Sequence, residues 1–163
     1  MTATVQIGEK NGAGATFTDK TSGTVRFKNA DDANVDLNNP LVKPPSGSDW
    51  SFEKWLRFKV TGGSYTQITG LKAYSDGASG FGTGVNLWAK AVASYATPAE
   101  GSASTGYASL FGYTAGAPLT LGAGPFTGTG EKGDHLVLLM EVAASASGGL
   151  LAAETLTIAW DEI

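Results

Sequence analysis

Residues 50–60 read Trp50-Ser51-Phe52-Glu53-Lys54-Trp55-Leu56-Arg57-Phe58-Lys59-Val60, and their side chains alternate in character. Every second residue from Trp50 to Val60 is apolar except Lys54, and the intervening residues are polar except Trp55. A repeat of two residues is typical of a β-strand with one face on a core. Because aromatic side chains bury the most apolar area, we expect the rest of the core to pack against this strand.

Shorter alternating segments recur along the chain, separated by Gly-rich turns. Strands are predicted near residues 5–7, 16–18, 24–28, 35–37, 68–74, 85–95, 135–142 and 155–161. Residues 97–130 give no clear pattern, and residues 143–154 fit either a short helix or a loop; long loops in compact domains are usually functional or mobile. The pattern predicts an all-β chain, an antiparallel β-sandwich or jelly-roll-like single domain.

The composition of residues 38–49 differs from the rest because it includes Pro40, Pro44 and Pro45. Proline cannot donate a hydrogen bond to a sheet, so we expect this segment to form an extended strap. Residues 1–37 form an N-terminal hairpin region with an extended N-terminal segment, and residues 50–163 form the main β-sandwich. The first 37 residues are too few for a core of their own, which favours one domain.

The charge content excludes several classes of partner and site. Charged residues make up 16% of the 163-residue chain, the net charge is −4, and there is no cysteine. Nucleic acid is not expected as a partner because binding phosphates requires a basic surface. The longest run of large apolar residues, 136–140, is too short to span a membrane, and the N-terminus lacks the pattern of a signal peptide. We therefore expect a soluble protein that is made in a cytoplasm.

No catalytic, cofactor-binding or metal-binding residues are predicted. His135 is the only histidine and follows Asp134, but no nucleophile stands at a suitable spacing, so a structural role is favoured. The Gly-x-Gly segments at 80–84 and 122–124 lack the lysine of a phosphate-binding loop and are expected to be turns. A calcium loop is conceivable from the oxygens of Asp31, Asp32, Asn34 and Asp36. Their spacing does not match such a loop, and a turn with side-chain-to-backbone hydrogen bonds is favoured.

Trp55 and Trp88 lie on the faces of their predicted strands that should point away from the core. Three interpretations are open: an exposed platform for a sugar ring, a contact with another protein, or the inner side of a second layer. A carbohydrate-binding module would use Trp55, Trp88 or Tyr74 for stacking.

Three segments, 52–60, 68–77 and 84–90, resemble virion structural proteins of tailed bacteriophages. They read FEKWLRFKV, ITGLKAYSDG and GVNLWAK, and the likeness covers roughly residues 50–98. Within that group, a small, cysteine-free, Gly/Ala/Thr-rich β chain looks most like a capsid decoration, or cement, protein. A tail or neck component is the alternative within the virion.

The resemblance implies a protein without enzymatic activity that sits on the capsid exterior as a homotrimer. Its partners would be the major capsid protein and its own copies, and it would stabilise the head by bridging capsid subunits. The low charge also favours a homo-oligomer, because such a surface is easily buried between subunits. Partner contacts are expected from Val5, Ile7, Leu41, Val42, Trp55 and Trp88. We also expect that residues 2–7 can be removed without unfolding the domain.

Overall fold

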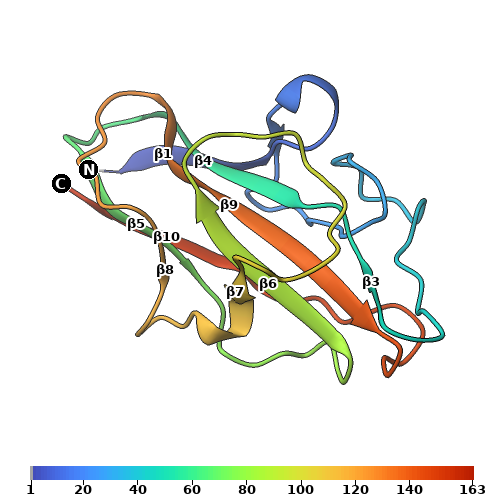
Figure 1. The fold of residues 1–163 in the computed structure, drawn as a ribbon. Coiled ribbons are helices and arrows are strands. Elements are labelled where there is room, and N and C mark those ends of the chain that lie inside the picture. Colours follow the sequence, from blue (N-terminus) through green and yellow to red (C-terminus); the bar gives the residue numbers. More distant parts are fainter. Residues whose placement is uncertain (1) are drawn as a thin grey trace.

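The computed structural model describes residues 2–163 and consists of two antiparallel sheets packed face to face (Figure 1). The larger sheet has the strand order β2-β1-β4-β9-β6-β7, with β3 also paired to β9. Its strands are β1 (Ala3–Glu9), β2 (Thr18–Asp19), β3 (Ser48–Trp50), β4 (Lys54–Gly63), β6 (Val85–Val92), β7 (Ala108–Ser109) and β9 (Gly130–Ala143). The smaller sheet contains β10 (Thr157–Glu162), β5 (Ile68–Tyr74) and β8 (Leu119–Gly122) in that order. The chain is therefore an all-β sandwich, as predicted.

The core lies between the two sheets and is made by alternate residues of their strands. Leu56, Phe58 and Val60 of β4 point into it, as do Leu136, Leu138, Met140 and Val142 of β9. From the smaller sheet, Ile68, Leu71 and Ala73 of β5 are fully buried. The ring of Trp160 on β10 lies 5.0 Å from that of Phe58, centroid to centroid, and joins the two sheets.

The segment 50–60 forms two strands, not one. β3 ends at Trp50 and β4 begins at Lys54, and both pair with β9. Between them the backbone N–H groups of Phe52 and Glu53 donate to the carbonyls of Lys28 and Ala99, which belong to loops rather than to β9. This break between β3 and β4 therefore lets the loops that contain Lys28 and Ala99 form hydrogen bonds with the larger sheet.

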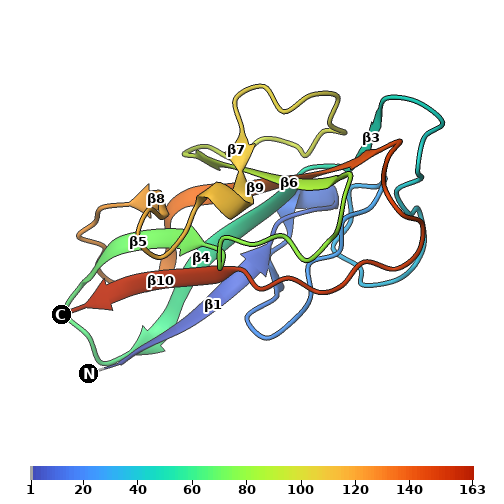
Figure 2. The same cartoon turned by 90° about the horizontal axis from the view of Figure 1, so that it is seen from below.

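The N-terminal segment is an integral strand of the larger sheet. Ala3 to Glu9 pair with Leu56 to Gly63 of β4, and Ala3 is 7% exposed. The Ala3 N–H donates to the Glu162 carboxylate of β10 at 3.1 Å, and Figure 2 shows the start of β1 near the end of β10. The expectation that residues 2–7 are dispensable for folding does not fit this arrangement.

Three other predicted elements differ from the structure. Residues 24–28 and 35–37 form no strands, and β2 pairs with β1 instead of with a hairpin partner. The region 97–130 contains β7, β8 and the short 3₁₀ helix η2 (Leu110–Gly112), whereas residues 144–156 contain no helix. A second 3₁₀ turn, η1 (Ala13–Ala15), follows β1. Of the strap predicted at residues 38–49, residues 38–47 form no strand, whereas Ser48 and Asp49 belong to β3.

The larger sheet is covered on both faces. Val137 and Leu139 of β9 point away from the smaller sheet, yet they are 0% and 1% exposed. The segment between β6 and β7 lies over them, and Figures 1 and 2 show it crossing the outer side of β9. A Cβ built on Gly101 in this segment would come within 2.6 Å of Leu139, so the cover is closely packed.

Candidate functional site

A large cavity separates the inner face of the larger sheet from the segments that cover it. The three-stranded sheet is too narrow to cover this face completely, so the remaining cover comes from residues 20–43 and 147–156, which form no strands. The cavity has a volume of about 1060 Å³. Its lining is mainly apolar and includes Val5, Ile7, Val25, Phe27, Leu41, Leu56, Phe81, Leu87, Phe111, Leu138, Met140, Leu151, Leu156, Ile158 and Trp160.

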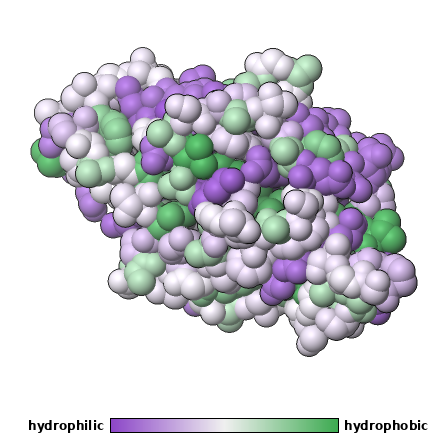
Figure 3. Space-filling view, in the orientation of Figure 1, coloured by the Kyte–Doolittle hydropathy of each residue, from purple (hydrophilic) through white to green (hydrophobic). Residues whose placement is uncertain are grey.

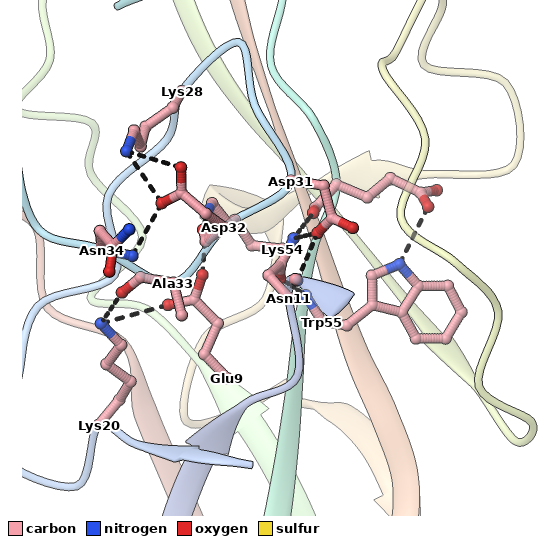
Figure 4. Close-up of polar contacts among 12 residues, drawn as sticks. Glu9, Asn11, Lys20, Lys28, Asp31, Asp32, Ala33, Asn34, Lys54 and Trp55 are labelled. Carbon is pink, nitrogen blue, oxygen red and sulfur yellow. Dashed lines mark hydrogen bonds and ion pairs between the residues drawn. The ribbon is translucent and has the colours of Figure 1, made fainter. Parts of the chain in front are cut away.

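Ion pairs to the buried Lys28 connect residues within the covering segment 28–36 (Figure 4). Lys28 is 1% exposed, and its Nζ lies 2.9 Å from Asp32 Oδ1 and 2.8 Å from Asp36 Oδ1. Burial alone would lower the pKa of Lys28, but the hydrogen bonds to both carboxylates raise it above its usual value. Likewise, burial tends to raise the pKa of Asp32, but hydrogen bonds from Lys28 and from the Asn34 backbone lower it overall. All three groups are therefore charged near neutral pH.

A second buried pair connects this segment to the sheet. Glu9 of β1 and Lys54 of β4 are both 0% exposed, and Lys54 Nζ lies 2.9 Å from Glu9 Oε1. Lys54 also donates to the Asp32 carbonyl at 2.6 Å. Lys20 lies 3.4 Å from Glu9 Oε2 and donates to the Ala33 carbonyl at 2.7 Å. Figure 4 shows these side chains converging between β1, β4 and the loop.

The carboxylates of the conceivable calcium loop therefore form hydrogen bonds and ion pairs within the protein. Asp31 Oδ1 accepts from Asn11 Nδ2 at 2.9 Å and from the Gly12 N–H at 2.8 Å, while Asn11 Oδ1 accepts from the Trp55 N–H. Asp32 accepts from the Asn34 N–H, which is the side-chain-to-backbone bond expected for a turn. Within residues 2–163, no group of three or more His, Cys, Asp or Glu side chains is arranged to hold a metal ion.

One residue of the sequence could have indicated this network. Lys54 occupies a core-facing position in the alternation of residues 50–60. A lysine at such a position requires a buried partner of opposite charge. Its partner Glu9 lies 45 residues away, so only the pairing of β1 with β4 reveals it.

Trp55 lies on the outer face of the larger sheet, under the segment between β6 and β7. It is 2% exposed, with the rings of Tyr95 and His135 at 5.3 Å and 5.4 Å. This placement fits the interpretation of a second layer. It leaves almost no surface of Trp55 for a sugar ring or a partner protein.

Glu53 connects the segment between β6 and β7 to the outer face of the larger sheet. Its Oε1 accepts a hydrogen bond from the Tyr107 hydroxyl and one from Lys90 Nζ at 3.2 Å, and its Oε2 accepts from Trp55 Nε1 at 3.0 Å. Burial tends to raise the pKa of Glu53, but these three donors lower it overall. Burial, together with the Glu53 carboxylate, raises the pKa of Tyr107. The arrangement joins an ionised carboxylate to a neutral phenol and has a structural role.

His135 is buried against the same aromatic rings, with 4% exposure. Its Nδ1 lies 3.2 Å from the Val92 carbonyl oxygen, and no hydrogen-bond partner for Nε2 is found in residues 2–163. Burial lowers the pKa of His135, and the positive charge of Arg57 lowers it further. The imidazole is therefore neutral near pH 7 and lies inside the structure instead of at its surface.

The other predicted contact residues have different environments. Val5, Ile7 and Leu41 are partly buried and line the cavity. Val42 is 64% exposed. Trp88 is half-buried, and its Nε1 donates to Glu141 Oε2 at 3.1 Å. The structure thus brings three of the six residues together at one site.

Comparisons of the chain with protein-family models, with curated proteins and with solved structures give no match in any of the three. Among residues 2–163, no helix has the length and apolar character needed to cross a membrane.

Proposed function

We propose that the protein is a structural component of a bacteriophage virion, which binds the outer surface of the capsid and stabilises it by bridging major capsid protein subunits. The resemblance of residues 50–98 suggests this role. Those residues contribute β4, β5 and β6, which form much of the sandwich. The protein would be made in the host cytoplasm and act as a homotrimer on the assembled head.

The distribution of exposed apolar side chains is the observation that carries the proposal. Five of the six exposed large hydrophobic residues lie in two covering segments, namely Val35, Leu37, Val42, Leu150 and Leu151. These segments lie away from the two termini (Figure 1). On the face shown in Figure 3, hydrophobic residues form small separate areas. Leu37, Leu150 and Leu151 contribute to the lining of one cavity, and exposed apolar groups that lie together are typical of a protein contact surface.

Such a surface suits attachment to a repetitive particle. Each leucine or valine contributes a modest amount when buried, about 1.5–3 kcal/mol for complete burial. Several contacts on each copy, repeated in a trimer, would raise the overall avidity without any strong individual contact. The low charge content also reduces the desolvation penalty of the contact.

Binding to undecorated heads tests the proposal. The double variant Leu37→Asp/Leu150→Asp changes two residues that are 65% and 81% exposed, so folding should be unaffected. We expect its occupancy on heads to fall at least tenfold, with loss of the added heat resistance. Ile163→Asp is the matched control, because Ile163 is 57% exposed at the C-terminus, away from these segments.

Wild-type occupancy of the double variant would refute the proposed contact surface. Absence of the wild-type protein from heads, with labelling of tails or necks in electron micrographs, would favour the tail or neck alternative.

A further inference from the structure

We propose that the cavity between the larger sheet and its covering segments binds an amphiphilic anion, a molecule with an apolar tail and a carboxylate or phosphate head, with Arg26 as the head-group ligand. This inference is independent of attachment to a capsid. It rests on the volume of the cavity, on the character of its lining and on the charge that the lining leaves unpaired.

The cavity is too large to be a packing defect. Protein interiors are packed as densely as organic crystals, and their voids are rarely larger than a water molecule. A volume of about 1060 Å³ is instead at the upper end of the range of small-molecule sites. Such sites also share the observed lining, which is mostly apolar with a few polar groups.

The charged groups that line the cavity are not equivalent. Lys20 is paired with Glu9, and Lys28 is paired with Asp32 and Asp36. Arg26 also lines the cavity, and its Nε is buried without a hydrogen-bond partner in the part of the chain that the structure describes. None of the ion pairs found in residues 2–163 includes Arg26. Lys43 and Glu154 also line the cavity, and no ion pair found in residues 2–163 includes them, so the unpaired charges of the lining are two positive and one negative. Among these three, only Arg26 has a buried nitrogen without a hydrogen-bond partner in the described residues.

An anionic head group would satisfy this arginine. A buried donor without an acceptor is unfavourable, and a guanidinium binds carboxylate or phosphate through two parallel hydrogen bonds. The remaining lining, which includes Phe27, Leu87, Met140 and Trp160, offers an apolar surface to a tail. Charge complementarity thus selects an anion over a neutral or cationic amphiphile.

The site also has an entrance. Leu150 and Leu151 are 81% and 37% exposed, and both contribute to the lining. They lie in a segment without strand hydrogen bonds, which can be displaced at lower cost than a paired strand. A tail could therefore enter between this segment and the strap.

Calorimetric titration with decanoate, decyl phosphate and decanol tests the inference on the intact chain. Decanoate or decyl phosphate should bind with a stoichiometry of one and more tightly than decanol. Arg26→Gln should weaken binding of the anions about tenfold or more, because a hydrogen bond to a charged group is lost, and should leave decanol unchanged. Whichever anion binds more tightly identifies the head group as carboxylate or phosphate.

Two further variants keep the test decisive. Lys72→Gln removes one positive charge from β5, outside the cavity lining, and should bind both anions like the wild type. Ala153→Trp places a large side chain at an exposed position of the lining and should weaken binding of all three probes, even if Arg26→Gln fails to fold. No binding by the wild type, or equal anion affinity in the wild type and a folded Arg26→Gln, would overturn the inference. An unaltered titration of Ala153→Trp would also overturn it.

Discussion

Replacing Lys54 by Met should destabilise the protein by about 3–5 kcal/mol, because it leaves the buried Glu9 carboxylate without its nearest cation. The magnitude follows from the geometry. Lys54 Nζ and Glu9 Oε1 are 2.9 Å apart and both side chains are 0% exposed. At an effective dielectric constant near 20, their attraction is roughly 6 kcal/mol. In the variant, Lys20 lies 3.4 Å from the other carboxylate oxygen of Glu9 and supplies part of this attraction. Met retains most of the apolar packing of the lysine stem.

Urea unfolding followed by tryptophan fluorescence measures the loss. With an m-value of roughly 2 kcal/mol/M, the midpoint should fall by about 2 M. The double variant Glu9→Leu/Lys54→Met is the informative control, because removing both partners of an ion pair is often close to neutral; Lys20 then keeps only the Ala33 carbonyl as a partner. Its destabilisation should be less than half the sum of the two single losses. A loss below about 1 kcal/mol for Lys54→Met, or single losses that add to within about 0.5 kcal/mol, would refute the reasoning.

Three other predictions concern the outer face and the N-terminus. Tyr107→Phe removes the phenol that donates to Glu53, and should cost about 1–3 kcal/mol in urea unfolding, with faster amide exchange in the segment between β6 and β7. His135 has a lowered pKa in the native state, so stability should decrease as the pH falls from about 6.5 toward that lower value; His135→Gln should lose this part of the dependence when urea midpoints at about pH 7.5 and about pH 5 are compared. A normal midpoint in Tyr107→Phe, or an unchanged pH profile in His135→Gln, would contradict these two predictions. Deletion of residues 2–7 removes most of β1 and should cost about 3 kcal/mol or more, detected as a lower melting temperature by circular dichroism; an unchanged melting temperature would restore the original expectation.

Alternation predicted strands correctly where a neighbouring strand was available to pair. The segments that became β4, β5, β6, β9 and β10 all lie beside a partner along most of their length. Residues 24–28 show why alternation is not sufficient. Val25 and Phe27 do pack toward the core, but they line the cavity and the backbone has no ladder there. The alternating pattern indicates an extended segment with one buried face, but a β-strand also needs a neighbouring strand to pair with.

The alternation of a single strand could not predict that the outer face of the larger sheet is buried. Alternation assigns Trp55 to the side opposite Leu56, and it says nothing about whether that side is covered. The cover comes from residues 93–107. The strand predicted at 85–95 was too long by three residues, because β6 ends at Val92, and the small and polar residues from 97 onward gave no clear pattern. The nearly continuous apolar run of 136–140 was the available signal, because a strand with both faces buried has no polar face.

The buried charges explain how a cavity of this size can persist beneath a cover without strands. A cover held only by apolar contacts would be free to move inward and fill the space, because the hydrophobic effect has no preferred direction. Ion pairs and hydrogen bonds are directional. Lys54 and Lys20 hold the carbonyls of Asp32 and Ala33 at fixed points near β1 and β4, and Lys28 joins Asp32 to Asp36. Moving this segment into the cavity would break the hydrogen bonds that the buried Lys54 and Lys20 donate to these two carbonyls, at a cost of about 1.5–3 kcal/mol for each. The network therefore acts as a fixed support for the cavity, and neutralising Glu9 and Lys54 together should reduce ligand binding even where overall stability is retained.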